Sequence, residues 1–385
     1  MPVDRITVGV AAGGLASFAL LYAPQPVLPQ IAAEYGIPPA QASLTVGVAT
    51  GALALGVIPL SLLSEITGRR PVLLMSVVVA AVVGLVVPLV PSFGVLVALR
   101  AVQGLALAGF PAVAMAYLAE RDRINAIGML IAGNTFGGMV GRLVAGQVGT
   151  WRAGTAVVAV LGALATVVLV VTLPKGDPRP VRTKIHLKPA VRKPILLALY
   201  AVAVLGMGAF VGLYNAIGFR LAAPPLSLSP QVASLVFVAY AIGAFSSATV
   251  GRMADKRRAL FAMLLLAAVG AIVTIPTNIV LVAIGFALFT AGFFAVHAAA
   301  SGWVNQVATD KGPASGLYSG SYYAGAFVGG TAGTSIYAAW GWVALVAASV
   351  GWLSLAAAGV WLAGRRKTLS SAKNLSRKTG APLAT

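Results

Sequence analysis

Two arginines lie inside long stretches of the chain that otherwise carry no formal charge. Arg100 and Arg142 are both flanked by uncharged, largely apolar residues. Charge in lipid is costly, so such a residue by default faces a cavity or a partner, and a guanidinium binds carboxylates and phosphates well. The two arginines are therefore candidates for holding an anionic ligand. Structural use is the alternative, with each guanidinium bonded to backbone carbonyls or reaching toward the membrane surface.

Titratable groups are scarce in the same stretches. No Asp or Glu lies in the middle of any of them, and arginine does not lose its proton in proteins. A proton carried across the membrane would therefore need His297, Glu34 near the end of the first stretch, or a carboxylate on the substrate. A single histidine in such a stretch more often has a structural role.

Tyrosines, amides and one histidine lie within these stretches, as do the two arginines, and a transport site is expected near the middle of the membrane. At that depth, glycine, proline and polar residues break regular helices around a transport site, and aromatic rings can stack on an amphiphilic molecule. Anchoring of helices to lipid headgroups is the alternative for any single tyrosine. The residues expected to line a substrate cavity are Tyr22, Gln25, Arg100, Gln103, Asn134, Arg142, Tyr214, Asn215, Tyr240, His297, Tyr322 and Tyr323.

Charged residues cluster in the short connectors between the apolar stretches. Ion pairs there are suited to a gate that forms on one face of a transporter while the other face opens. The expected gate contains Glu65, Arg69 and Glu120, with Asp255 and Arg257 as a looser counterpart in the second half; Arg70 lies beside Arg69. Solvated surface pairs, worth about 0–1 kcal/mol, are the alternative.

The elements that must position these residues are membrane-spanning helices. Of the 385 residues, 59% are hydrophobic and only 9% are charged, whereas a soluble domain carries roughly 25% charged residues. A span needs about 20 apolar residues. Uncharged runs that each fit one span are 6–33, 35–64, 71–99, 101–119, 153–174, 194–219 and 221–251.

The remaining stretches complete the set. Residues 123–152 form one further span that only Arg142 interrupts, while 259–309 and 312–364 are each long enough for two spans, with turns expected at 276–278 and 339–342. The sequence therefore predicts an all-α membrane protein with twelve transmembrane helices.

The placement of the basic residues predicts the orientation. A net charge of +19 in a soluble protein would suggest nucleic acid, but nearly all of the 27 Lys and Arg residues fall in alternate connectors. By the positive-inside rule these connectors and both termini lie in the cytoplasm. We expect a multi-pass protein of the cell inner membrane, with no nucleic-acid partner. The first apolar run is longer than a signal-peptide core and is expected to be retained as a span.

The two halves of the chain show weak similarity at a spacing of about 190 residues, as in transporters built from repeats. Residues 65–70 match 251–258, Tyr22 matches Tyr214, and Trp151 matches Trp340. The expected organisation is an N-terminal six-helix bundle (1–173), a basic cytoplasmic linker (174–193), a C-terminal six-helix bundle (194–364) and a basic cytoplasmic tail (365–385).

Across 6–364 the chain resembles the major facilitator superfamily, whose fold is two pseudo-symmetric six-helix bundles. The loop 61–70 and its copy 251–255 are similar to the family's loop between spans two and three, although Ser61 replaces a glycine and Glu65 an aspartate. Residues 100–104 match the proton-linked members' motif of arginine, two residues, glutamine and glycine. Residues 133–142 resemble the antiporter motif, with Gly138 at a common proline position. The likeness is greatest to acriflavin-sensitivity and arabinose-efflux-like exporters.

The resemblance implies secondary active efflux of a small organic molecule, such as a drug or sugar-like metabolite, coupled to protons. Transport of an anionic metabolite held by Arg100 and Arg142 is the alternative, and a non-transporting membrane sensor or scaffold is a different class. With two histidines, no cysteine and no phosphate-binding loop, neither an enzyme nor an ATP-driven pump is expected. We expect a monomer in the lipid bilayer, with no cofactor or metal.

Overall fold

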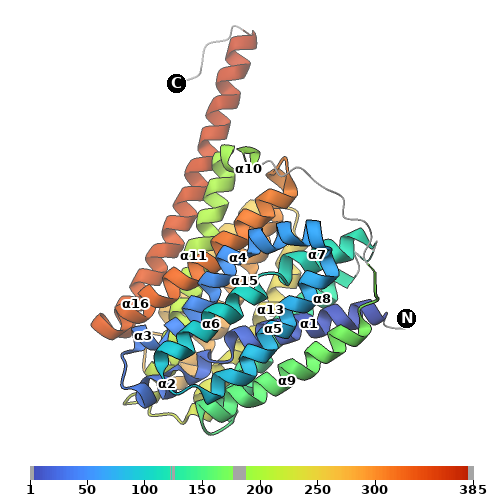
Figure 1. Cartoon of the computed structure of the whole chain (residues 1–385). Coiled ribbons are helices and arrows are strands. Elements are labelled where there is room, and N and C mark those ends of the chain that lie inside the picture. Colours follow the sequence, from blue (N-terminus) through green and yellow to red (C-terminus); the bar gives the residue numbers. More distant parts are fainter. Residues whose placement is uncertain (1–3, 122, 124–125, 177–187, 380–385) are drawn as a thin grey trace.

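The computed structural model describes residues 4–121, 123, 126–176 and 188–379, with backbone alone for 188–189 and 366–379. In this part of the chain all regular structure is helical, and long helices run side by side as a bundle (Figure 1). Most of the basic linker predicted at 174–193 lies outside the described residues, as do Asp122, Asp177 and His186.

Six spans make up the first half. The first is α1 (Arg5–Tyr22) continued by η1 (Gln25–Val27) and α2 (Leu28–Tyr35). A short α3 (Pro39–Ala42) leads to the others: α4 (Leu44–Thr67), α5 (Arg69–Val86) with η2 (Val87–Leu89), α6 (Phe93–Leu107) with α7 (Pro111–Glu120), α8 (Ile127–Gln147) and α9 (Trp151–Thr172).

The second half repeats this arrangement after a short α10 (Lys188–Arg192). Its spans are α11 (Pro194–Ala222), α12 (Pro230–Ser234) with η4 (Leu235–Val238) and α13 (Ala239–Gly251), α14 (Lys256–Val273), α15 (Ile279–Val307), and α16 (Lys311–Thr379), which contains two spans.

The described residues provide the twelve predicted spans. Ten helical segments are long and apolar enough to cross a membrane. α14 is an eleventh of 18 residues, whose first turn carries the three basic residues 256–258. α16 supplies the twelfth because Gly341, with φ 79° and ψ −173°, breaks it inside the predicted turn. Figure 1 shows the two arms of α16 meeting at this break.

Because successive spans run in opposite directions, their ends gather at two opposite ends of the bundle. We call one the basic end, because the helix ends there carry Arg5, Arg69, Arg121, Lys193, Arg252, Lys256 and Lys311. We call the other the Trp151 end, where α9 begins and α16 reverses. At the basic end, α4 and α5 are joined by Gly68 alone, whose φ of 98° favours glycine.

Glycine triplets bring paired spans into backbone contact in both halves. In the first half α8 lies against α1, and in the second half α16 lies against α11. A Cβ atom on any of the six glycines would overlap backbone atoms of the facing helix, as expected where small residues let membrane helices approach closely. The triplets repeat at the predicted spacing of about 190 residues: Gly133, Gly137 and Gly141, then Gly325, Gly329 and Gly333.

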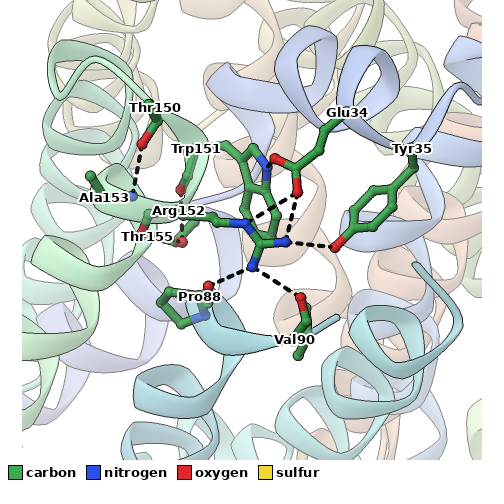
Figure 2. Close-up of polar contacts among 9 residues, drawn as sticks. All are labelled: Glu34, Tyr35, Pro88, Val90, Thr150, Trp151, Arg152, Ala153 and Thr155. Atoms are coloured by element: carbon green, nitrogen blue, oxygen red, sulfur yellow. Dashed lines mark hydrogen bonds and ion pairs between the residues drawn. The ribbon is translucent and has the colours of Figure 1, made fainter. Parts of the chain in front are cut away.

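A polar cluster ties three spans of the first half together at the Trp151 end (Figure 2). Arg152 donates to the carbonyl oxygens of Pro88 (2.7 Å) and Val90 (2.9 Å) and pairs with Glu34 at 2.6 Å. Its guanidinium lies 4.5 Å from the ring of Trp151, whose indole N–H also bonds to Glu34. The cluster joins the ends of α2 and η2 to the start of α9.

The second half contains a similar cluster built from another span. Arg220, near the end of α11, donates to the carbonyl oxygens of Ile275 (2.8 Å) and Pro276 (2.9 Å). Its guanidinium lies 4.6 Å from the ring of Trp342, whose indole N–H donates to Thr274 Oγ1 at 3.0 Å. These bonds fasten α11 and the second arm of α16 to the end of α14.

The predicted match between Trp151 and Trp340 is wrong by two positions. Trp340 is 73% exposed, whereas Trp342 is 7% exposed and occupies the place that Trp151 has in the first half. The physical reason is the break at Gly341: the chain reverses there, so Trp342 is the tryptophan that begins the last span.

The halves touch each other between the middle of the bundle and the Trp151 end. The facing residues Gly47 and Gly51 of α4 pack on Phe327 of α16. Gly316 and Gly320 lie on the same face of α16 as Phe327, eleven and seven residues earlier, and a Cβ there would meet nothing within 4 Å. Hydrogen bonds between halves join Gln25 to Asn215 (2.7 Å), Ser43 to Thr334 (2.9 Å) and Gln147 to Ser234 (2.9 Å).

The α1–α8 contact gives a stability test on one helix. Gly137→Ala should lower the free energy of unfolding by about 1–3 kcal/mol, the usual range for overpacking, because its Cβ would overlap the backbone of Leu15. Gly128→Ala is the matched control, since a Cβ there meets nothing within 4 Å. Thermal unfolding of both purified variants in detergent checks this, and equal stability would contradict the close approach.

Candidate functional site

Arg142 lies between the halves, on the last two turns of α8. It is 2% exposed, and aromatic rings from both halves surround its guanidinium. The guanidinium carbon lies 4.0 Å from the ring centre of Tyr22, 4.5 Å from that of Tyr240 and 5.6 Å from that of Phe237. Cation–π contacts of this kind gain about 2 kcal/mol or more when desolvated. The rings therefore stabilise a cation that is nearly out of contact with solvent.

A hydrogen-bonded chain leads from Arg142 into the second half. Arg142 Nε donates to Gln25 Oε1, and Gln25 Nε2 donates to Asn215 Oδ1 at 2.7 Å. Arg142 Nη1 donates to the carbonyl oxygen of Gly138 at 2.6 Å. Gln25 reaches this position because the Pro24 and Pro26 region ends α1 and puts Gln25 in the short η1 turn.

Buried polar atoms near these hydrogen-bonded side chains have no partner among the residues that the structure describes. These are Asn215 Nδ2 and Tyr240 Oη, on side chains that are 1% and 5% exposed as whole residues. Asn134 Oδ1 is also unpaired and lies against Gly14 of α1, apart from the Arg142 contacts. Buried polar groups in proteins are normally satisfied. The hydroxyl of Tyr240, whose ring lies 4.5 Å from the Arg142 guanidinium carbon, and Asn215 Nδ2, which lies beside Gly330 of α16, therefore indicate places where a ligand or water would bond.

Arg100 is fully engaged inside the first half. Its guanidinium donates to the carbonyl oxygens of Leu20 (3.0 Å), Thr45 (2.7 Å) and Leu21, and to Gln103 Oε1. Gln103 Nε2 in turn donates to the Ala80 carbonyl oxygen at 2.8 Å. The two side chains join four spans, and they also line a small pocket together with Ala23, Pro24 and Gly84. The expectation that Arg100 and Gln103 line the substrate cavity stays a prediction.

Aromatic side chains of the second half continue the site away from Arg142. Tyr214 bonds to Thr290 Oγ1 through its hydroxyl at 2.6 Å, and its ring centre lies 5.3 Å from that of Tyr240. Phe210 stacks on Phe293 at 4.1 Å. Sequence reasoning missed Phe237, Phe210 and Phe293; the position of Phe237 three residues before Tyr240, on one helix face, was the available signal.

His297, on α15, lies among tyrosines of α16 that continue the aromatic group, because the ring centre of Tyr322 is 6.3 Å from that of Phe293. Its Nδ1 is 3.0 Å from the hydroxyl of Tyr318, a residue that sequence reasoning missed, and its ring centre is 4.6 Å from that of Tyr322. Tyr323 follows Tyr322 but packs into a core cluster of the first half. Most of the predicted cavity residues therefore lie around Arg142 or along the aromatic group that leads from it to His297. Arg100 and Gln103 bond within the first half, Asn134 lies against Gly14, and Tyr323 packs on Tyr322 and on a first-half core cluster.

The predicted gate residues form two clusters at the basic end, each within one half. Arg69 is 6% exposed and bonds to Glu120 at 2.9 Å and to Ser64 Oγ at 2.6 Å, with Glu65 farther away at 3.7 Å. Arg70 follows Arg69 on α5. Glu65, Arg69 and Glu120 are thus in contact with one another, and these contacts lie within the first half.

The second-half cluster differs from the expectation. Asp255 begins α14, accepts a bond from the Arg258 backbone N–H at 3.0 Å and pairs with the Arg258 side chain at 3.2 Å. Its predicted partner Arg257 instead lies beside Gly364 on the last span. The reason is helix geometry: Arg258 is three residues after the cap, where both bonds to Asp255 are possible. Glu34, a candidate proton carrier, is occupied by Arg152 and Trp151.

Metal binding has no support in the part of the chain that the structure describes, since no three His, Asp or Glu side chains come together there.

The hydrogen bonds of Arg100 give a second test. Arg100→Gln should lower the free energy of unfolding by at least about 3 kcal/mol, because two or more hydrogen bonds from a charged group are lost. Arg252→Gln removes the same charge from an exposed position at the basic end and is the control. Thermal unfolding in detergent is the measurement, and an Arg100→Gln protein as stable as the control would contradict the structural role.

A third test separates the two acids around Arg69. Glu120→Gln should lower the unfolding free energy by about 1 kcal/mol, since it weakens a hydrogen bond at 2.9 Å. Glu65→Gln should have less than half that effect because its oxygen lies 3.7 Å from Arg69. Chemical or thermal unfolding at low salt compares them, and a larger effect of Glu65→Gln would contradict the geometry.

Curated relatives cover nearly the whole chain. It is 35% identical over 363 residues to the uncharacterized MFS-type transporter YybF of Bacillus subtilis (strain 168), covering 90% of both chains. It is 35% identical to the inner membrane transport protein YnfM of Escherichia coli (strain K12), over 88% of this chain and 85% of that one. A chloramphenicol resistance protein of Streptomyces lividans is 30% identical over 67% of this chain and 68% of its own.

A solved structure supports the fold. The inward-facing, unoccupied structure of a bacterial homologue of the human lysosomal transporter Spinster superposes with a TM-score of 0.76 at 17% identity, covering 94% of this chain and 96% of that one. The sequence model of the Major Facilitator Superfamily matches residues 10–308. With its twelve spans and these relatives, the chain belongs to the Major Facilitator Superfamily and is a multi-pass inner-membrane transporter, not an enzyme.

Proposed function

We propose that the chain exports a small organic molecule by alternating access and that the proton gradient drives the export. One observation carries the proposal: Arg142 and its rings lie between the halves, behind contacts that hold the halves together toward the Trp151 end. The same face of α16 is uncovered toward the basic end, at Gly316 and Gly320. A site reached from one end and closed from the other is what alternating access requires.

Two observations support export: the orientation expected for the bundle in the membrane and the similarity of the sequence to exporters. With the basic end in the cytoplasm, as the positive-inside rule favours, the contacts at the Trp151 end would close the outer side and the site would load from inside the cell. The span-five stretch 133–142 resembles the antiporter motif, and the chloramphenicol resistance protein is a relative.

Proton coupling is supported by the 100–104 motif and by His297. His297 Nδ1 is bonded to Tyr318, and in the described residues its Nε2 has no hydrogen-bond partner. Imidazole exists in neutral and protonated forms in proteins, so it is a side chain that can accept and release a proton during a transport cycle. In this proposal His297 carries the proton, and the Arg69 cluster takes part in closing the basic end in the other state of the cycle.

The test is solute-dependent proton movement in proteoliposomes. Full-length protein is reconstituted with pyranine inside, a pH gradient is imposed, and chloramphenicol, uridine and 1-naphthoate are added in turn. At least one solute should move protons opposite to its own flux, and His297→Gln should reduce this coupled flux at least roughly tenfold, because the titrating group is gone.

The controls are empty liposomes and Lys311→Gln, which removes an exposed charge at the basic end. Solute flux through the wild-type protein that is equal with and without the pH gradient would contradict proton coupling. Net uptake toward the basic end under a physiological gradient would contradict export.

A further inference from the structure

We propose that the Arg142 site recognises a carboxylate on the transported molecule, with Asn215 and Tyr240 of the second half as its further hydrogen-bond donors. The inference deepens the proposed function and rests on it for the location of the site. It names the substrate class as an organic acid with an aromatic or apolar body, rather than a neutral or cationic compound.

The first argument is the direction of the hydrogen-bond chain. An arginine can only donate, so Gln25 must turn its oxygen to Arg142 and its nitrogen to Asn215, as observed. Asn215 must then accept with its oxygen, and its buried Nδ2, at the end of this hydrogen-bonded chain, has no acceptor in the described part of the protein. The orientation of every amide is fixed by the cation, and the chain ends in a donor. A ligand group that completes it has to be an acceptor.

The second argument is a comparison among the arginines that lie away from the basic end. Arg100, Arg152 and Arg220 each reach three or more oxygen acceptors of their own half. Arg142 reaches two, Gln25 Oε1 and the Gly138 carbonyl oxygen, and its Nη2 bonds to nothing in the described residues. No described Asp or Glu pairs with Arg142. Its charge is buried without a counterion.

The third argument concerns shape and chemistry. Rings of Tyr22, Tyr240 and Phe237 surround the guanidinium, and the buried hydroxyl of Tyr240 has no hydrogen-bond partner within the described ranges. A carboxylate offers two acceptor oxygens and no donor hydrogen, which suits Arg142 Nη2, Asn215 Nδ2 and the Tyr240 hydroxyl. A primary amide would bring two donor hydrogens to a site that supplies donors, and a cation would be repelled by Arg142.

The experiment compares molecules that differ only in this group. Full-length protein in detergent is mixed with aromatic carboxylates and their primary amides, for example 1-naphthoate with 1-naphthamide, and with benzyltrimethylammonium. The melting temperature and equilibrium dissociation constant are measured. Carboxylates should bind at least roughly tenfold more tightly than their amides, which corresponds to about 1.4 kcal/mol, and the cation should not bind.

Three variants locate the effect. Arg142→Gln should remove the preference for carboxylates. Asn215→Asp places a carboxylate of the chain itself beside the Gln25–Arg142 unit, so it should abolish carboxylate binding while the protein stays folded with an unchanged or higher melting temperature. Lys311→Gln loses the same charge at an exposed position and should bind like the wild type.

Amides that bind as tightly as carboxylates, no carboxylate binding to the wild type, or carboxylate binding retained in Asn215→Asp would each overturn the inference. Proton-coupled flux of uridine or chloramphenicol without carboxylate binding would overturn it and leave export standing. Carboxylate binding that depends on Arg142, in a protein without gradient-driven flux, would support the inference and contradict the proton coupling.

Discussion

A guanidinium that is buried within a membrane bundle has to be surrounded by acceptors from its own chain, and the polar architecture of this protein follows from that constraint. Lipid offers no hydrogen bonds, and an unsatisfied group costs several kcal/mol there. Arg100, Arg152 and Arg220 meet the requirement with backbone carbonyl oxygens where helices bend or end. Each of them therefore joins spans inside one half. Arg142 meets it with aromatic rings, the Gln25 amide oxygen and the Gly138 carbonyl oxygen, and it touches both halves.

The two halves pack their helices in the same way, but they place different polar residues at the interface. Equivalent glycine triplets hold α8 on α1 and α16 on α11, and equivalent tryptophans begin the last span of each half. After the last glycine of each triplet, however, the first half has Arg142 and the second has Thr334, which bonds to Ser43 of the other half. Close packing holds the helices of each half together. The residue after the triplet differs between the halves, so the interface has a charged contact from Arg142 and a neutral contact from Thr334.

The spans were predictable from the sequence because a helix that crosses lipid needs a minimum length and few charged residues. Both properties are visible in the sequence itself. The turn around Gly341 and the glycine repeat belong to the same class of signal. What a polar side chain bonds to was not predictable, since it depends on helix rotation and on where carbonyl groups become free. Arg100 and Arg142 look alike in sequence yet bond differently. Tyr318 was missed because apolar runs give no sign of which ring turns inward, whereas Phe237 could have been found from its position three residues before Tyr240. Asp255 was assigned to Arg257, although helix geometry favours Arg258.

The two ends of the bundle are held by different kinds of contact. Hydrogen bonds between uncharged side chains join the halves toward the Trp151 end, at Ser43 and Thr334 and at Gln147 and Ser234. The basic end instead concentrates ion pairs such as Arg69 with Glu120. Mobile ions screen exposed charges within a Debye length of about 8 Å at physiological ionic strength and hardly affect neutral bonds. Added electrolyte therefore leaves the hydrogen bonds that join the halves almost unchanged and acts on exposed ion pairs within each half, such as Arg152 with Glu34 and Arg258 with Asp255.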